Sequence, residues 1–306
     1  MDFRIPLGDW AEAVVSFLLT HGQGVFDAID TVVGALADGV QTMLSSMPGL
    51  ALAGLIVFIG FWRLGWRFAL FAAASLLLVA GLGLWKQTVD TLALVLTATG
   101  LALAIGLPLG IWAARSDRVE TAVRPILDLM QTMPAFVYLI PAAMFFGLGR
   151  VPGTFATIIF AMPPAVRLTS LGIRQVPREL VEAGIAFGCT GRQLLFKVQM
   201  PTALPSIMAG VNQTIMLSLS MVVIASMIGA GGLGNEVLRG IQRLDIGLGF
   251  ESGLAVVILA VLLDRITQSF GTGRVRPSLR ERLGLAGRPI PTAVSRPTAG
   301  GVTPAR

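Results

Sequence analysis

Long apolar runs restrict this chain more than any other feature of its sequence. Seven segments of 17 to 24 residues are predominantly apolar, and an α-helix that rises about 1.5 Å per residue needs roughly 20 residues to cross a bilayer. Hydrophobic residues make up 54% of the chain and charged residues 13%, which is more apolar surface than one soluble core can bury. We therefore predict an all-α, polytopic membrane protein, with spans at 43–62, 68–85, 91–114, 126–148, 151–171, 207–228 and 247–263.

Basic and acidic residues are distributed unevenly, and this asymmetry predicts the orientation of the chain. Residues 1–42 contain six acids and one base, Arg4, whereas residues 271–306 contain seven arginines and one acid. Because Lys and Arg concentrate in cytoplasmic loops, we expect the N-terminus outside and the C-terminus in the cytoplasm. The net charge of +6 is then a consequence of topology, and binding to nucleic acid is not predicted.

The same patterns divide the chain into four predicted parts. The composition of the last part, rich in Arg, Pro and Gly, predicts disorder. The parts are an extracytoplasmic amphipathic tail (1–42), two accessory spans (43–88), a core of five spans (89–270) with a cytoplasmic loop (173–203), and a basic cytoplasmic tail (271–306).

Few residues could support catalysis or metal binding. Cys189 and His21 are the only residues of their types, so neither a disulfide within the chain nor a Cys/His metal site is expected. A phosphate-binding P-loop requires Gly followed by Lys, but Lys86 and Lys197 both follow an aromatic residue. We predict no catalytic residues and no cofactor on this chain, so any ATP hydrolysis requires a separate polypeptide.

The loop at 173–203 has well-specified local structure. Pro177 suits the first turn of an amphipathic helix, and Gly188 can end that helix in a left-handed conformation. Thr190 and Gln193 have the spacing of a capping box, which predicts a second helix running toward Pro201. Two short helices at a sharp angle would suit a groove on another protein. The alternative is an ordinary connecting loop that lies on the lipid headgroups.

This loop resembles the EAA loop in the membrane subunits of bacterial ABC importers, whose pattern is EAA, three residues, G, nine residues, I, one residue, LP. The spacing matches throughout, and the departures Gly184 for Ala, Val198 for Ile and Met200 for Leu keep small or apolar side chains. Segments 128–141, 208–234 and 263–268 are similar to the glycine betaine/proline betaine permease branch, and the similarity covers 89–270. The matching positions are Glu182, Ala183, Gly184, Gly188, Val198, Met200 and Pro201.

The resemblance implies a fold, a function and a set of partners. The fold would be the five-helix core of a type I importer permease, and the EAA loop would be the helix that couples it to a cytoplasmic ATPase. The expected partners are two ATPase subunits, which bind ATP and Mg, an extracytoplasmic substrate-binding protein, and a second copy of the permease. Specificity would reside mostly in the binding protein.

The route of the substrate is less clearly marked. Prolines within the spans at 126–148 and 151–171 leave backbone carbonyls that need partners, which indicates either a pore lining or ordinary kinks between packed helices. An aromatic face can attract a quaternary ammonium group, although a lone tyrosine also serves for packing. Polar residues inside a span are expensive in lipid and turn inward, either to line the route or to join helices. The candidates for the route are Gln131, Thr132, Phe136, Tyr138, Asn212 and Gln213.

Several substrates and one other class of transporter are consistent with these patterns. By resemblance the first expectation is glycine betaine or proline betaine, taken up as an osmoprotectant or for catabolism, and the alternatives are choline, carnitine and trimethylamine N-oxide. A secondary carrier would need a carboxylate or an ion site within the membrane and often has inverted repeats. No internal repeat is visible, so a carrier is the more distant alternative.

Overall fold

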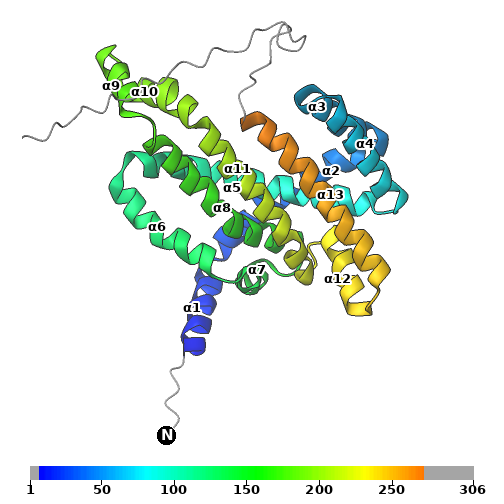
Figure 1. The fold of residues 1–306 in the computed structure, drawn as a ribbon. Helices are drawn as coiled ribbons and strands as arrows, with labels where there is room; N and C mark the ends of the chain where they lie inside the picture. The colour runs from blue at the N-terminus through cyan, green and yellow to red at the C-terminus, as the bar shows by residue number, and fades with distance from the viewer. Residues whose placement is uncertain (1–6, 272–306) are drawn as a thin grey trace, which may run out of the picture. The chain divides into compact units, whose positions relative to one another are not determined.

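The computed structural model describes residues 7–271, and this part of the chain contains helices and no strands, which confirms the predicted all-α class (Figure 1). Short 3-10 turns at η1 and η3 and a π-helical turn at η2 interrupt or join the longer helices. In chain order the elements are α1 (Leu7–His21), α2 (Gln23–Ser46), α3 (Gly49–Leu64), α4 (Trp66–Gly81), α5 (Trp85–Arg115), α6 (Asp117–Thr132), η1 (Ala135–Tyr138), α7 (Leu139–Phe146), α8 (Arg150–Arg174), α9 (Arg178–Ala186), α10 (Gly191–Leu194), η2 (Leu195–Gln199), α11 (Met200–Ala225), η3 (Ser226–Ile228), α12 (Leu233–Arg243) and α13 (Ile246–Gly271).

In the described part of the chain, fewer helices than the seven predicted spans have the length and composition of a membrane span. Within residues 7–271, four helices are long and apolar enough to cross a membrane, and there are up to six spans if each of two sharply bent helix pairs counts as one. The difference is α4, which has 16 residues and a length of about 24 Å, less than the roughly 30 Å of a hydrocarbon core. Helix α3 has the same length and forms a hairpin with α4 through Gly65.

Helices α5, α8 and α11 form the centre of the described part (Figure 1). Small residues allow α5 and α8 to approach closely: a Cβ atom at Gly110 would lie 2.7 Å from the carbonyl oxygen of Val166. A Cβ atom at Gly106 would lie 3.1 Å from that of Ala165. This Gly-x-x-x-Gly pair therefore serves close helix contact, as its spacing predicts.

The predicted span at 126–148 is not one continuous helix. Helix α6 ends at Thr132, and the segment Ala135–Phe146 departs from it at an angle of 108°. Met133 adopts an extended conformation with ψ of 137°, because the ring of Pro134 disfavours the helical region for the residue before it. By contrast, α8 continues through Pro163 and Pro164 without a break.

Residues 7–42, within the amphipathic tail predicted for 1–42, lie mostly in helices α1 and α2. Helix α2 packs against α5 and α8 and buries Val33, Ala37 and Leu44. Helices α2 and α3 meet at 99° around Pro48, inside the predicted span 43–62. Apolar residues on one face of α2 thus attach it to the core. The basic tail predicted for 271–306 lies, apart from Gly271, outside the described residues.

Candidate functional site

The loop that follows α8 begins with a short helix whose two ends are well defined. Helix α9 starts directly after Pro177, which has φ of −51° and stands at the N-cap position. At its other end, Gly188 has φ of +77°, and its N–H donates to the carbonyl of Ile185 at 2.9 Å. The N–H of Cys189 donates to the carbonyl of Gly184 at 3.0 Å. These two bonds form a Schellman motif, so the predicted left-handed helix end is confirmed.

The second helix of the loop begins as predicted but does not end as predicted. Thr190 and Gln193 form a capping box, in which the backbone N–H of Thr190 donates to Oε1 of Gln193 at 2.9 Å. Helix α10 then continues through the π-helical turn η2 into α11, and Gly191–Ile228 forms one span of 38 residues. Pro201 lies in the first turn of α11, where a missing N–H is tolerated. It therefore does not end the loop helix.

The small and apolar residues at the end of α9 differ in their exposure to solvent. Gly184 is buried, and a Cβ atom there would lie 2.7 Å from Cδ1 of Leu194, so this position holds α9 against α10. Phe187 is 90% exposed, the highest value among the large hydrophobic residues of the described segment. Glu182 lines a cavity of about 560 Å³ behind the loop together with Arg115 and Arg178. The loop tip thus offers an unburied aromatic ring beside charged groups.

The positions that match the end of the EAA pattern lie at the start of the long helix. Val198 belongs to the π-helical turn and is partly buried, as is Met200, whereas Lys197 is exposed. Ala183 is exposed on α9. The motif therefore spans the whole helix-turn-helix unit, from α9 to the first turn of α11.

The candidates for the substrate route do not share one environment. Gln131, Thr132 and Phe136 are exposed at the break between α6 and η1. Tyr138 is buried, and its hydroxyl donates to the carbonyl of Met130 at 2.9 Å. Its ring lies 6.4 Å from that of Phe160. In this structure Tyr138 packs the break together and leaves Phe136 as the accessible aromatic residue.

The two candidates on α11 also differ from each other. Nδ2 of Asn212 donates to Oδ1 of Asp264 at 2.8 Å, and Nε2 of Gln268 donates to the same oxygen at 2.7 Å. Gln213 is exposed. Asn212 therefore connects α11 to α13, which is the helix-joining alternative for the polar cluster. The carboxylate of Asp264 thus accepts hydrogen bonds from the side-chain amides of Asn212 and Gln268.

Comparison with known proteins identifies the family. Residues 106–272 match the family described as the inner membrane component of binding-protein-dependent transport systems. The chain belongs to this family. It is thus a permease component, with no catalytic role, of a transport system whose other parts include a binding protein.

Two relatives of the permease are similar over most of its length. It is 53% identical to the glycine betaine/proline betaine transport system permease protein ProW of Escherichia coli (strain K12), over 87% of this chain and 75% of that one. It is 52% identical to the glycine betaine/carnitine transport permease protein GbuB of Listeria monocytogenes serotype 1/2a (strain 10403S), over 87% and 95%.

A solved structure shares the fold of the permease. An inward-facing conformation of the MetNI methionine ABC transporter aligns with a TM-score of 0.54 and 23% identity, over 60% of this chain and 94% of that chain. This likeness concerns the fold alone. It agrees with the predicted importer-permease core within an all-helical membrane protein.

Sequence reasoning missed a set of ion pairs between α6 and α8 of the permease. Arg167 contacts Asp128 through Nη2 and Oδ1, and Arg174 contacts both Asp117 and Glu120 at 2.7 Å. Asp128 and Arg167 lie inside predicted spans, at 126–148 and 151–171, where a charged residue is a signal of function. Attention to single charges within apolar runs would have found them.

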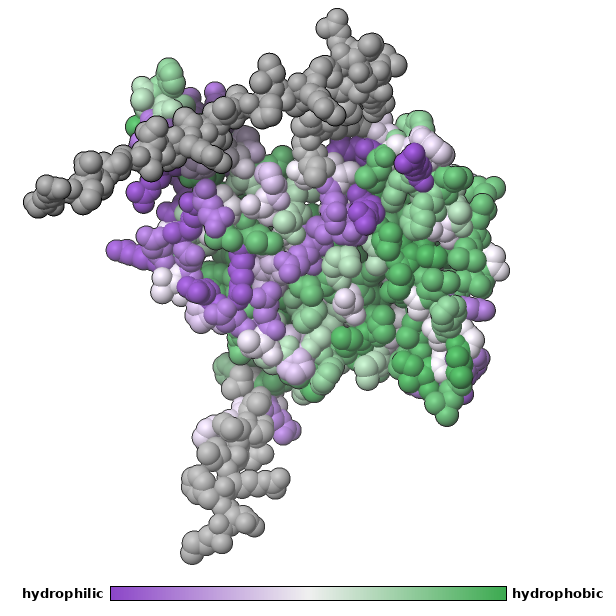
Figure 2. Space-filling model, in the orientation of Figure 1, coloured by the Kyte–Doolittle hydropathy of each residue, from purple (hydrophilic) through white to green (hydrophobic). Residues whose placement is uncertain are grey.

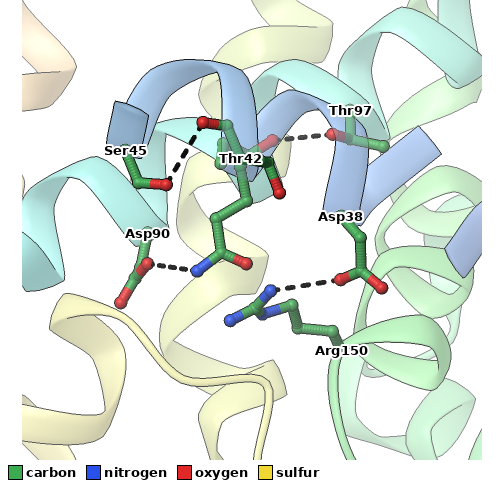
Figure 3. Close-up of polar contacts among 8 residues, drawn as sticks. Asp38, Thr42, Ser45, Asp90, Thr97 and Arg150 are labelled. Atoms are coloured by element: carbon green, nitrogen blue, oxygen red, sulfur yellow. Dashed lines mark hydrogen bonds and ion pairs between the residues drawn. The ribbon is translucent and has the colours of Figure 1, made fainter. Parts of the chain in front are cut away.

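Helix α2 of the permease is attached to the core by polar contacts as well as by apolar ones (Figure 3). Nε2 of Gln41 on α2 donates to Oδ1 of Asp90 on α5 at 2.7 Å, and Nη1 of Arg150 on α8 contacts Oδ1 of Asp38 at 3.4 Å. Gln41 and Asp38 lie outside residues 89–270, which the resemblance to importer permeases covers, whereas Asp90 and Arg150 lie inside them. The two contacts show that α2 is held by two helices of the core.

No metal site is visible in the described part of the permease. Residues 7–271 contain no group of three or more His, Cys, Asp or Glu side chains that could hold a metal ion.

Proposed function

We propose that the permease is the membrane subunit of an ATP-driven importer for glycine betaine, with proline betaine or a related quaternary amine as a further substrate. The observation that carries this proposal is identity above 50% to two permeases that are both named for glycine betaine transport. They differ in the second substrate that each name contains, so glycine betaine is the shared element. Choline, carnitine and trimethylamine N-oxide remain alternatives within the same family.

The loop supports a coupling role. Its turn at Gly188 is closed by backbone bonds and by the capping box, so it can transmit a displacement with little loss. Phe187 is a large exposed aromatic residue, the type that dominates protein interfaces. We infer that α9 and α10 bind a cytoplasmic ATPase subunit. The residues assigned to this coupling loop are Glu182, Ala183, Gly184, Gly188, Val198, Met200 and Pro201.

The proposal includes an assembly and a topology. Two copies of the permease would surround one path, two ATPase subunits would bind ATP and Mg inside, and a binding protein would deliver substrate outside. This requires a cytoplasmic loop between α8 and α11. With an outside N-terminus it also requires the short helix α4 to cross the membrane, as in the topology of seven spans that the distribution of basic residues supports. The path would pass the exposed candidates Gln131, Thr132, Phe136 and Gln213.

Uptake by the reconstituted complex tests the importer proposal. The permease, its ATPase subunit and its binding protein are placed in proteoliposomes, and vanadate-sensitive uptake of labelled glycine betaine is measured. A secondary carrier predicts uptake that an uncoupler abolishes while ATP is maintained. Uptake that is insensitive to vanadate would contradict the proposal.

Charge reversal in the loop tests coupling separately. We expect Glu182→Arg to abolish substrate-stimulated ATP hydrolysis while the protein still inserts into the membrane. Glu12→Arg, on exposed α1, is the matched control and should leave hydrolysis unchanged. Normal stimulation in the Glu182 variant would show that the loop does not couple in the proposed way.

A further inference from the structure

A pair of opposite charges lies at membrane depth on the surface of the permease. Asp128 on α6 contacts Arg167 on α8, and their side chains are 55% and 39% exposed. Asp128 follows the first residue of α6 by about 16 Å along the helix axis, and Arg167 precedes the last residue of α8 by about 10 Å, at about 1.5 Å per residue. Under the proposed topology both charges lie near the cytoplasmic surface of the membrane, two residues inside the predicted span 126–148 and four residues inside the predicted span 151–171.

Half-exposed charges near the end of a span do not face the hydrocarbon of the bilayer. Charged side chains inside a membrane face a water-filled cavity or another protein segment, because burial in hydrocarbon is costly. Hydrophilic residues gather over α6 and beside it, whereas the surface over α3 and α4 is mostly hydrophobic (Figure 2). The surface over α6 is therefore better suited to water or to a protein partner than the surface over α3 and α4.

A cavity of about 250 Å³ opens beside the pair. Asp128, Arg167, Ser170 and Arg124 are among its lining residues. This volume is smaller than the roughly 300–1,000 Å³ of sites that hold drug-sized ligands, so the cavity suits a small molecule. Its lining includes carboxylate and guanidinium groups together.

Ser170 supplies an independent observation. Its side chain is buried, with 6% of the residue exposed, and its Oγ has no hydrogen-bond partner within residues 7–271. Buried hydroxyl groups nearly always have a partner. Because Ser170 lines the cavity beside Arg167, its hydroxyl is placed to bond a molecule that enters the cavity.

The chemistry of the pair selects one class of ligand. Arg167 offers a guanidinium group, which binds carboxylates in a planar, bidentate geometry. Asp128 offers a carboxylate, which attracts a quaternary ammonium group by charge alone, since such a group has no N–H to donate. A ligand with both groups can replace the internal ion pair without leaving either charge alone, and the pair can re-form when the ligand departs.

We propose that Asp128, Arg167 and Ser170 form a transient binding site for a small zwitterion with one carboxylate and one quaternary ammonium group, on the substrate route through the permease. This inference rests on the proposed function, which supplies the reason for such a ligand to pass. The site releases its ligand readily because the resident ion pair competes with it. It extends the route from the break at Gln131 and Phe136 toward the cytoplasm.

Protection of an introduced cysteine tests the site without measuring transport. The complete complex in lipid nanodiscs carries Cys189→Ser, which removes the single natural cysteine, and Ser170→Cys. The rate of modification by methyl methanethiosulfonate is measured with and without millimolar glycine betaine. We expect glycine betaine to slow the reaction several-fold, and choline chloride at the same concentration, which lacks a carboxylate, to have little effect.

Variants of the pair, each made in the Ser170→Cys complex, supply the controls. Asp128→Asn and Arg167→Gln should each remove the protection. Asp38→Asn and Arg150→Gln break the ion pair that α8 makes with α2, and these variants should retain the protection. Two outcomes would show that the pair only joins α6 to α8. One is that glycine betaine does not change the modification rate of the Ser170→Cys complex. The other is that the protection survives in Asp128→Asn and Arg167→Gln.

Uptake gives a second measurement that does not need the cysteine. We expect Asp128→Asn and Arg167→Gln to lower glycine betaine uptake by about tenfold, the effect of about 1.4 kcal/mol, while the ATPase subunit still co-purifies. Parental uptake rates in both variants would overturn the site and leave the importer function intact. Protection by glycine betaine in a complex that does not import it would instead support the site and contradict the proposed function.

Discussion

Gly188 shows how one backbone conformation maintains the turn of the proposed coupling loop. Its φ of +77° lies in the left-handed region, where a side chain with a Cβ atom costs about 1–2 kcal/mol. A Cβ atom at this position would meet no other atom within 4 Å, so the cost of a substitution there is conformational and not steric.

Because the cost at Gly188 is conformational and not steric, two substitutions that differ in their tolerance of the left-handed region can test the turn. We expect Gly188→Val to disrupt the Schellman motif and to reduce substrate-stimulated ATP hydrolysis, whereas Gly188→Asn should retain most of it because Asn tolerates the left-handed region. ATP hydrolysis by the reconstituted complex is the measurement. Equal activity of the Val and Asn variants would mean that the turn conformation is unimportant for coupling.

Phe187 carries the expected contribution of the loop tip to assembly. The side chain is 90% exposed, so its truncation removes little buried surface from the permease itself. We expect Phe187→Ala to reduce the ATPase subunit that co-purifies by about tenfold, since exposed aromatic anchors commonly contribute more than about 1.4 kcal/mol to an interface. The thermal stability of the isolated permease should not change.

Leu148→Ala is the matched control for this experiment. Leu148 is 79% exposed and lies outside the loop, between α7 and α8, so its truncation should affect neither co-purification nor stability. Co-purification of the Phe187 variant at the parental level would remove Phe187 from the proposed interface.

At the scale of helices, the contact between α5 and α8 depends on the absence of side chains. A Cβ atom at Gly110 would lie 2.7 Å from the carbonyl oxygen of Val166 and 2.8 Å from Cβ of Thr169. We expect Gly110→Ala to separate the helices and to lower the free energy of unfolding by about 1–3 kcal/mol, measured as a lower Tm of the purified permease.

Gly100 on the same helix is the control for this prediction. A Cβ atom there would meet nothing within 4 Å, so Gly100→Ala should raise stability by up to about 1 kcal/mol through helix propensity. A Tm for Gly110→Ala at or above that of Gly100→Ala would contradict the tight packing of α5 on α8.

The continuity of α10, η2 and α11 has a consequence at the same scale. The coupling loop is joined to a span of 38 residues with no flexible segment between them. Rotation or displacement of α9 and α10 by a partner would therefore move α11 directly. This arrangement is more rigid than two short helices followed by a separate span.

For the whole molecule, the side of the membrane on which the loop lies decides the transport scheme. Cys189 is the single cysteine of the chain and is partly exposed in the loop. We expect a membrane-impermeant maleimide to label Cys189 in inside-out vesicles and not in intact, right-side-out vesicles. Leu148→Cys in a Cys189→Ser background should show the opposite pattern. Labelling of Cys189 from the outside alone would exclude a cytoplasmic ATPase at this loop.

The local order of the chain follows from short stretches of sequence. Apolar runs predict the helical class. The spacing of Pro177, Gly188, Thr190 and Gln193 predicts both ends of α9 and the start of α10, because caps and turns depend on neighbours within a few residues. The break at Pro134 and the seam of Gly106 and Gly110 are local signals of the same kind. The family is likewise apparent from the loop motif.

The partners of the polar side chains depend on segments far apart in the chain. Tyr138 turns into the core and Asn212 binds Asp264, although both belong to patterns that equally suit a pore. Asp128 and Arg167 are 39 residues apart in sequence, and only the packing of α6 against α8 brings their charges together. The spacing of residues along a helix determines which side chains share a face. Which other helix packs against that face depends on the tertiary structure of the whole bundle.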